Sequence, residues 1–259
     1  MDIHLFSTIA FGIFGLLFGS FSNVCVHRIP IGESIVSPGS RCPNCRTNIA
    51  WYDNIPLLSW LILKGKCRHC SSPITWRYPM LELSMGIIWA TLAWNYPLSP
   101  YPSLFLIQSL FLVSMLWVLT LIDIETFLLP DVITLPGIAI GLIFAWFDGY
   151  IFDAAIGALA GYGIFWLVAR LFLLATGREG MGQGDFKLLA MLGAFMGWQA
   201  LPFIILLSSV TGSILGTISL LLAKKGLKAE IPFGPYLATA GVIWFFWGIP
   251  ILHWYQSIL

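Results

Sequence analysis

Residues 104–123, LFLIQSLFLVSMLWVLTLID, form a nearly uninterrupted apolar run that ends in the carboxyl group of Asp123. As an α-helix, the stretch 104–122 is about 28 Å long, which matches the roughly 30 Å hydrocarbon core of a bilayer. Hydrophobic residues make up 58% of the 259-residue chain and charged residues only 10%. The sequence therefore predicts a membrane protein that is surrounded by lipid, and we expect no nucleic-acid partner.

Comparable apolar runs recur along the whole chain. We predict an all-α polytopic membrane protein with about eight transmembrane helices, of which the sixth is short, at residues 5–26, 80–96, 104–122, 132–147, 154–175, 188–200, 203–223 and 235–253. The first run lacks a basic n-region and a small-residue cleavage site, so we expect a retained helix rather than a signal peptide.

The organisation of the chain changes between about residues 79 and 103. One span and a long polar loop precede this point, and closely spaced helices follow it. We therefore predict an N-terminal part, residues 1–100, with the first span, the loop and the second span. The remaining helices, residues 101–259, form the second part. No internal repeat is visible.

Positive charges predict the orientation in the membrane, because short loops rich in Lys and Arg stay on the cytoplasmic side. Seven of the thirteen lie in the first loop: Arg28, Arg41, Arg46, Lys64, Lys66, Arg68 and Arg77. With eight spans, five more fall on the same side: Arg178, Lys187, Lys224, Lys225 and Lys228. Only Arg170 has to reach that face by extending its side chain. We expect this face to be cytoplasmic and both termini to lie on the opposite side.

The first loop contains two cysteine pairs, Cys42-Pro-Asn-Cys45 and Cys67-Arg-His-Cys70. Each CxxC turn lets two sulfurs converge on one ion, and four thiolates favour tetrahedral zinc. We predict a structural zinc site that supplies folding energy to the loop. A redox dithiol and four free thiols are the alternatives. His69, between two ligands, is expected to be an exposed loop histidine.

Two aspartates, Asp123 and Asp185, stand at predicted span ends near one depth on one side of the membrane. Carboxylates at the edge of lipid are costly and often functional. Two of them brought together cannot both ionise cheaply, so one keeps a proton while the other can act as a base on a shared water. This is the chemistry of an aspartic protease. Gly182 and Gly184 would let substrate or a neighbouring helix approach Asp185 closely.

A single aspartate at a span end is more often a helix cap or a solvated interface residue. Asp131, Asp148 and Asp153 fit that description. Two acids on one predicted face, in a chain without an HExxH or Walker motif, favour a catalytic pair.

Several further short motifs occur together with the cysteine pairs. They are Phe18-Gly19-Ser20-Phe21-Ser22-Asn23-Val24 with Arg28 and Pro30, Asn54-Ile55-Pro56-Leu57 with Ser59-Trp60, Arg77-Tyr78-Pro79 with Glu82, Ile122-Asp123 with Leu129-Pro130-Asp131, Gly182-Gln183-Gly184-Asp185 with Lys187, and Pro232-Phe233-Gly234-Pro235. In this combination the chain resembles the type IV prepilin peptidases, a family of bifunctional leader peptidases and N-methyltransferases of the bacterial inner membrane.

The resemblance implies that the chain cuts the basic leader from type IV prepilins and type II secretion pseudopilins at the cytoplasmic face. It also implies methylation of the new N-terminal residue with S-adenosylmethionine. By motif, the catalytic aspartates are Asp123 and Asp185, and the zinc ligands are the four cysteines. Residues 1–100 would then be associated with methyl transfer and residues 101–259 with peptidase activity.

The methyl-donor site is implied by likeness alone, because no glycine-rich nucleotide loop follows a predicted strand. Arg77 and Glu82 are weak candidates for it, and a salt bridge at a helix start is the alternative. Glu125, Asp131 and Glu179 would attract a basic leader or would simply be solvated loop charges.

The sequence is also compatible with two other functions. A transporter would use Asp123 and Asp185 to relay protons or bind a cation. A zinc-organised membrane scaffold would need the cysteines and neither aspartate.

Overall fold

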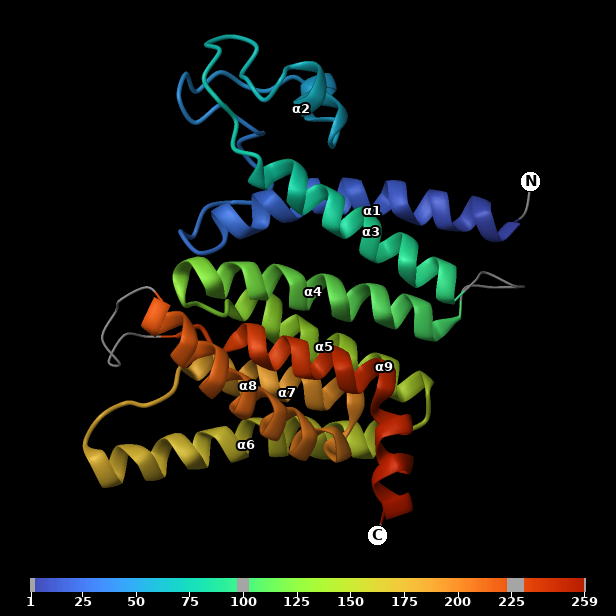
Figure 1. Ribbon diagram of the computed structural model, residues 1–259, viewed down its shortest axis with the longest axis vertical. Helices are drawn as coiled ribbons and strands as arrows, with labels where there is room; N and C mark the ends of the chain where they lie inside the picture. The colour runs from blue at the N-terminus through green and yellow to red at the C-terminus, as the bar shows by residue number, and fades with distance from the viewer. Residues whose placement is uncertain (1–2, 97–102, 223–230, 259) are drawn as a thin grey trace. The chain divides into compact units, whose positions relative to one another are not determined.

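The computed structural model describes residues 3–96, 103–222 and 231–258 (Figure 1). Its regular secondary structure is helical, and the described β-structure is limited to two isolated bridges. Each predicted span coincides with an α-helix, so the all-α class is confirmed. These helices are α1 (Ile3–Arg28), α3 (Arg77–Asn95), α4 (Leu104–Thr126), α5 (Asp131–Phe147), α6 (Ile151–Thr176), α7 (Gln183–Met196), α8 (Leu201–Leu222) and α9 (Gly234–Ile258).

Not every one of these helices is long and apolar enough to cross a bilayer. Among the described residues five segments meet that requirement: Ile3–Arg28, Leu104–Thr126, Ile151–Thr176, Trp198–Ile218 and Gly234–Tyr255. Helix α5 is apolar but shorter. The count of eight crossings therefore stays a prediction. Lys224, Lys225 and Lys228, which the predicted orientation uses, lie outside the described residues.

The chain divides into two compact units, residues 1–114 and 115–259, with the boundary inside α4. In the first unit, α1 packs along α3 through small residues. A Cβ added at Gly15 would lie 2.6 Å from the Met85 carbonyl oxygen, and one at Gly19 would lie 2.7 Å from Glu82 Cα. These distances mean that the two backbones are in near contact, which is the packing that small residues permit in membrane helices. Asn23 of α1 joins the pair by donating to the Tyr78 carbonyl at 3.2 Å.

The polar loop between α1 and α3 contains two short helices, η1 (Trp51–Asn54) and α2 (Leu58–Ile62). It also contains a repeat that the sequence did not predict. Residues 40–49 and 65–74 each fold into a turn closed by a bridge, Arg41 with Asn48 and Lys66 with Pro73. The loop thus consists of two copies of one turn joined by the short helices.

In the second unit, α7 forms the core. Leu188, Leu189, Met191 and Leu192 are fully buried, and α7 packs against α5, α6 and α9. With fourteen residues α7 is only about 21 Å long, so packing within the protein rather than contact with lipid accounts for its apolar sequence. Gly161 of α6 allows the close approach, because a Cβ there would lie 2.7 Å from the Leu189 carbonyl oxygen.

Candidate metal centre and carboxylate pair

The four loop cysteines converge in the structure. The sulfur atoms of Cys42, Cys45, Cys67 and Cys70 all lie within 4.8 Å of one another. The Cys42 and Cys70 sulfurs are 3.8 Å apart, which is about the edge length of a tetrahedron with 2.3 Å zinc–sulfur bonds. The donor set therefore fits a tetrahedral metal ion. His69 is exposed and is not part of this cluster.

The repeated turns place the sulfurs. In the first turn, the Cys42 amide donates to the Thr47 carbonyl at 3.0 Å and the Arg46 amide donates to the Cys42 carbonyl at 2.9 Å. In the second turn, Cys67 with Ser72 and Ser71 with Cys67 make the same bonds at 2.9 and 3.0 Å. Arg46 and Ser71, each directly after a CxxC pair, share a positive φ of 59° and 57°. Each turn therefore presents its two thiols in the same way.

Hydrogen bonds around the cluster favour the thiolate form of Cys70. The Ser72 side chain and backbone lower the pKa of the Cys70 thiol to about 6. The Asn44 amide lies 3.8 Å from the same sulfur. Outside the cluster, Arg68 makes two bonds to Asp53, at 2.6 and 2.7 Å, and these bonds lower the pKa of the Asp53 carboxyl. A ready thiolate is the form that binds metal.

Asp123 and Asp185 are both buried in the second unit, with 4% and 8% of their surface exposed. Asp123 lies in the last turn of α4 and Asp185 in the first turn of α7. The two carboxyl groups are close enough for the charge of Asp123 to act on Asp185. Asp123 is not a cap of its own helix, because caps bind amides at a helix N-terminus.

Leu129 packs against two glycines, one beside each acid: Gly184, next to Asp185, and Gly234, next to Asp123. A Cβ at Gly184 would lie 2.7 Å from Leu129 Cβ, and one at Gly234 would lie 3.1 Å from Leu129 Cδ2. The Gly234 amide donates to Asp123 Oδ2 at 2.8 Å. Gly182, the other glycine of the predicted motif, lies just before the first turn of α7. A Cβ added there would have one neighbour within 4 Å among the described residues, Asp185 Oδ2 at 3.6 Å.

The amide of Gly234 is a feature that residue patterns did not assign. The donor and acceptor are 111 positions apart, and no spacing rule connects a helix N-terminus to a carboxylate so far away. The segment Pro232-Phe233-Gly234-Pro235 was one of the motifs that carry the family resemblance, but no role was predicted for Gly234.

The remaining acids differ from one another in their surroundings. Asp131 pairs with Lys187 at 2.6 Å, so its charge is already balanced, and Glu179 is exposed. Glu82 is buried and accepts a hydrogen bond from the Leu57 amide at 2.8 Å. The ion pairs found among the described side chains do not include one between Arg77 and Glu82.

Comparison with known proteins covers both parts of the chain. Residues 13–96 match the family model described as the bacterial peptidase A24 N-terminal domain, and residues 110–217 match the type IV leader peptidase family. No solved structure matches the chain.

Curated relatives match over nearly the whole length. The chain is 43% identical over 261 residues to a prepilin leader peptidase/N-methyltransferase of Stutzerimonas stutzeri, covering 91% of this chain and 89% of the relative. It is 43% identical over 268 residues to the Pseudomonas aeruginosa protein of the same name, covering 94% and 91%. For the Legionella pneumophila protein, the identity is 37% over 275 residues, covering 96% and 94%. The chain therefore belongs to the type IV leader peptidase family.

Proposed function

We propose that this chain is a membrane aspartic endopeptidase that removes the leader of type IV prepilins and type II secretion pseudopilins and then N-methylates the new N-terminal residue. The relatives are named for both activities. The observation that supports the peptidase half is that Asp123 and Asp185 are both buried next to residues that contact Leu129: Gly234, whose amide binds Asp123, and Gly184, which precedes Asp185. We place the site at the cytoplasmic face of the inner membrane, where the lysines and arginines are concentrated.

In this mechanism the two aspartates share one water. Asp123 is the carboxylate that we assign as the base, because the amide at the α9 N-terminus stabilises a negative charge on its Oδ2. Asp185 holds the proton and donates a hydrogen bond to the peptide carbonyl oxygen as the water oxygen attacks the carbon. Asp123 takes a proton from the water as the new carbon–oxygen bond forms and the carbonyl electron pair moves to oxygen. The tetrahedral adduct then collapses: the carbonyl re-forms, the carbon–nitrogen bond breaks, and the leaving nitrogen takes the proton that Asp123 holds. No covalent intermediate with the enzyme forms.

The four-cysteine cluster is proposed to hold zinc with a structural role. Four protein thiolates complete a tetrahedral shell and leave no position for a water, so the ion would organise the loop. For the second activity, S-adenosylmethionine would supply an electrophilic methyl group to the peptide amine. Arg77 and Glu82 are the residues proposed near that donor.

The experiment is cleavage of a purified prepilin by the purified full-length protein in detergent, with products measured by mass spectrometry. Asp123→Asn and Asp185→Asn should each lower the cleavage rate by about a hundredfold or more, since acid–base catalysis contributes about 10²–10⁴-fold.

Asp148→Asn is the matched control, because Asp148 is an exposed residue at the end of α5, and it should cleave normally. Normal cleavage by either active-site variant would remove that aspartate from the mechanism. Uncut prepilin together with an aspartate-dependent ion flux would favour a transporter instead.

A further inference from the structure

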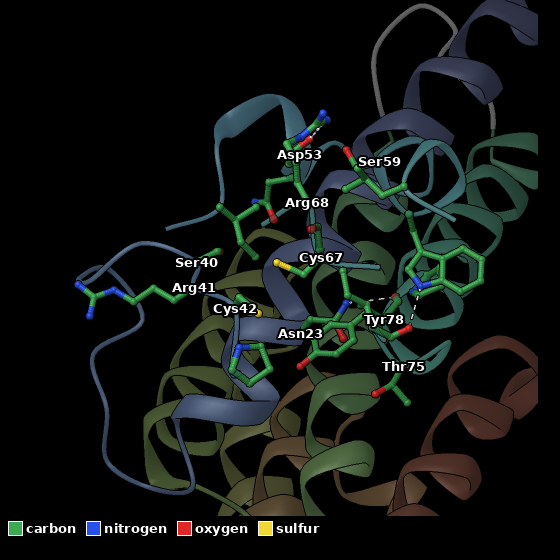
Figure 2. Close-up of a pocket in the computed structure, with 18 of the residues that line it drawn as sticks. Asn23, Ser40, Arg41, Cys42, Asp53, Ser59, Cys67, Arg68, Thr75 and Tyr78 are labelled. Atoms are coloured by element: carbon green, nitrogen blue, oxygen red, sulfur yellow. Dashed lines mark hydrogen bonds and ion pairs between the residues drawn. The ribbon is translucent and has the colours of Figure 1, made fainter. Parts of the chain in front are cut away.

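The first unit contains a cavity of about 260 Å³ whose role the peptidase mechanism does not explain. Figure 2 shows it between the end of α1, the start of α3 and the cysteine loop. Its wall includes Asn23 of α1, Tyr78 and Glu82 of α3, and Leu57 and Trp60 of the loop. All of the lining residues belong to the first unit, so the cavity does not include the aspartate pair.

Glu82 is the unusual group in this wall. The residue is 9% exposed. Its Oε2 accepts a hydrogen bond from the Leu57 amide, and the Ser20 side chain also hydrogen-bonds to the carboxyl group. Glu82 belongs to neither of the ion pairs Arg68–Asp53 and Lys187–Asp131. A buried carboxylate without a cationic partner is costly, and a positively charged ligand in the cavity would offset that cost.

Other charged groups of the wall are already bound to the protein. Arg68 is paired with Asp53 at 2.6 Å. Arg28 donates to the carbonyls of Ser34, Pro38 and Gly39. Arg41 donates to the Asn48 side chain at 3.0 Å. Arg28 and Arg41 keep their positive charge, because the oxygens that they bind are neutral. Glu82 is a buried carboxylate of the same wall, so a positively charged part of a ligand would be stabilised beside it, and a negatively charged part beside the arginines.

The rest of the wall suits an uncharged ring and its polar substituents. The Trp60 indole is fixed by donation to the Ile74 carbonyl at 3.1 Å, and Val24, Ile49 and Leu63 add apolar surface. Thr75 and Tyr78 supply hydroxyl groups. The volume lies just below the range of about 300–1,000 Å³ typical of small-molecule sites. An open site of this size suits a donor whose reactive group must remain accessible to a peptide.

We propose that this cavity binds S-adenosylmethionine, with the Glu82 carboxylate recognising its positively charged sulfonium. The inference rests on the proposed methyl transfer and adds the location of the donor and the residue that selects its charge. Arg77, the other residue proposed near the donor, does not line the cavity, so of the two residues this inference retains Glu82 as the contact to the ligand.

Two ligands that differ in this charge test the proposal. S-adenosylmethionine carries the sulfonium, and S-adenosylhomocysteine carries a neutral thioether in its place. Binding of both to the zinc-loaded, detergent-solubilised full-length protein is measured by calorimetry. Glu82→Gln should weaken binding of S-adenosylmethionine by about tenfold or more, because contacts to a charged partner are roughly twice as strong as neutral ones. Binding of S-adenosylhomocysteine should change by less than about threefold by the same reasoning.

Glu33→Gln is the matched control, since it removes an exposed glutamate of the same loop outside the cavity, and both affinities should stay at the wild-type values. Thr75→Trp is a second variant for the case in which Glu82→Gln does not fold. Thr75 is an exposed residue of the wall, so a larger side chain there should fill the cavity without disturbing a core and should weaken both ligands.

Three results would overturn the proposal: absence of S-adenosylmethionine binding by the wild-type protein, equal losses for both ligands in a folded Glu82→Gln protein, or unchanged binding of both in Thr75→Trp. Zinc content and the thermal midpoint of every sample report folding. Leader cleavage by the wild-type protein and Glu33→Gln is measured on the same samples. A wild-type protein that binds S-adenosylmethionine and leaves prepilin uncut would contradict the proposed peptidase and leave this site intact.

Discussion

At the residue scale, Asp123 is held by a backbone amide. Its position in the last turn of α4 is unfavourable for an anion, because carbonyl groups at a helix C-terminus carry partial negative charge. The Gly234 amide, at the start of α9, compensates with a bond of 2.8 Å. Gly234 is thus a positioning residue for the proposed base rather than a group that touches substrate.

The contact between Gly234 and Asp123 predicts how adding one methyl group, in Gly234→Ala, changes the rate of leader cleavage. In Gly234→Ala the added Cβ would lie 2.7 Å from Asp123 Oδ2, so the carboxylate must move. Leader cleavage should fall about 10- to 100-fold, since a displacement of roughly 1 Å can cost about 10² in rate. Steady-state cleavage with purified prepilin measures this.

Gly163→Ala is the matched control, because nothing lies within 4 Å of its added Cβ. Its cleavage rate should equal that of the wild type. Equal rates for both alanine variants would show that the position of Asp123 does not depend on Gly234.

The acids themselves were predictable from sequence, whereas their surroundings were not. Asp123 and Asp185 stood out because each ends or begins an apolar run. Hydrophobic periodicity carries no information about which loop returns to a given carboxylate. The hydrogen bond from the Gly234 amide and the packing of Leu129 against two glycines therefore could not be predicted from the sequence and are seen only in the folded structure.

At the scale of elements, the loop is built from two copies of one turn. The sequence identified the CxxC pairs, and hence the sulfurs that converge. The repeat itself was not predicted, although residues 40–49 and 65–74 share a basic residue, the two cysteines and a final isoleucine at the same positions. The likeness extends to backbone hydrogen bonds and a positive φ after each cysteine pair, which only the structure shows.

This construction predicts the metal content of the protein. Protein purified without any chelator should contain about one zinc ion per chain. The Cys42→Ser protein should contain much less zinc, because its three remaining thiolates leave the tetrahedral shell incomplete. Elemental analysis measures both values.

Cys25→Ala is the control, since Cys25 is buried in α1 and lies outside the cluster. It should retain the metal of the wild type. A wild-type content far below one ion per chain, or full zinc in Cys42→Ser, would contradict the metal centre.

Helix α7 shows what an apolar run leaves undecided. Its sequence predicts a short span at residues 188–200, but the helix covers Gln183–Met196 and is enclosed by its neighbours within the second unit. Burial in a protein core and burial in lipid select the same side chains. The apolar composition therefore predicts a helix here but does not show whether protein or lipid surrounds it.

At the scale of the whole molecule, the number of crossings decides where the termini lie. Eight spans place both termini on one side of the membrane, while the five segments that meet length and apolarity requirements would place them on opposite sides. Eight spans bring the positive charges of the later loops to the same side as those of the first loop, which favours that number.

Reporter fusions distinguish these arrangements. Alkaline phosphatase is active only outside the cytoplasm, so a fusion at the C-terminus should be active and a green fluorescent protein fusion there should be dark. A phosphatase inserted at the exposed Glu33 of the first loop should be inactive. Activity of the loop fusion would reverse the predicted orientation, and an inactive phosphatase with a bright fluorescent fusion at the C-terminus would contradict an even number of spans.

The most direct measurement is a cross-link between positions 123 and 185 in the full-length protein. Asp123→Cys/Asp185→Cys, treated with a short bifunctional thiol reagent and mapped by mass spectrometry, should yield peptides joined through these positions. Asp148→Cys/Asp185→Cys should not, because Asp148 is exposed at the far end of α5. A 123–185 yield no higher than that of the control would contradict the claim that the two carboxyl groups converge.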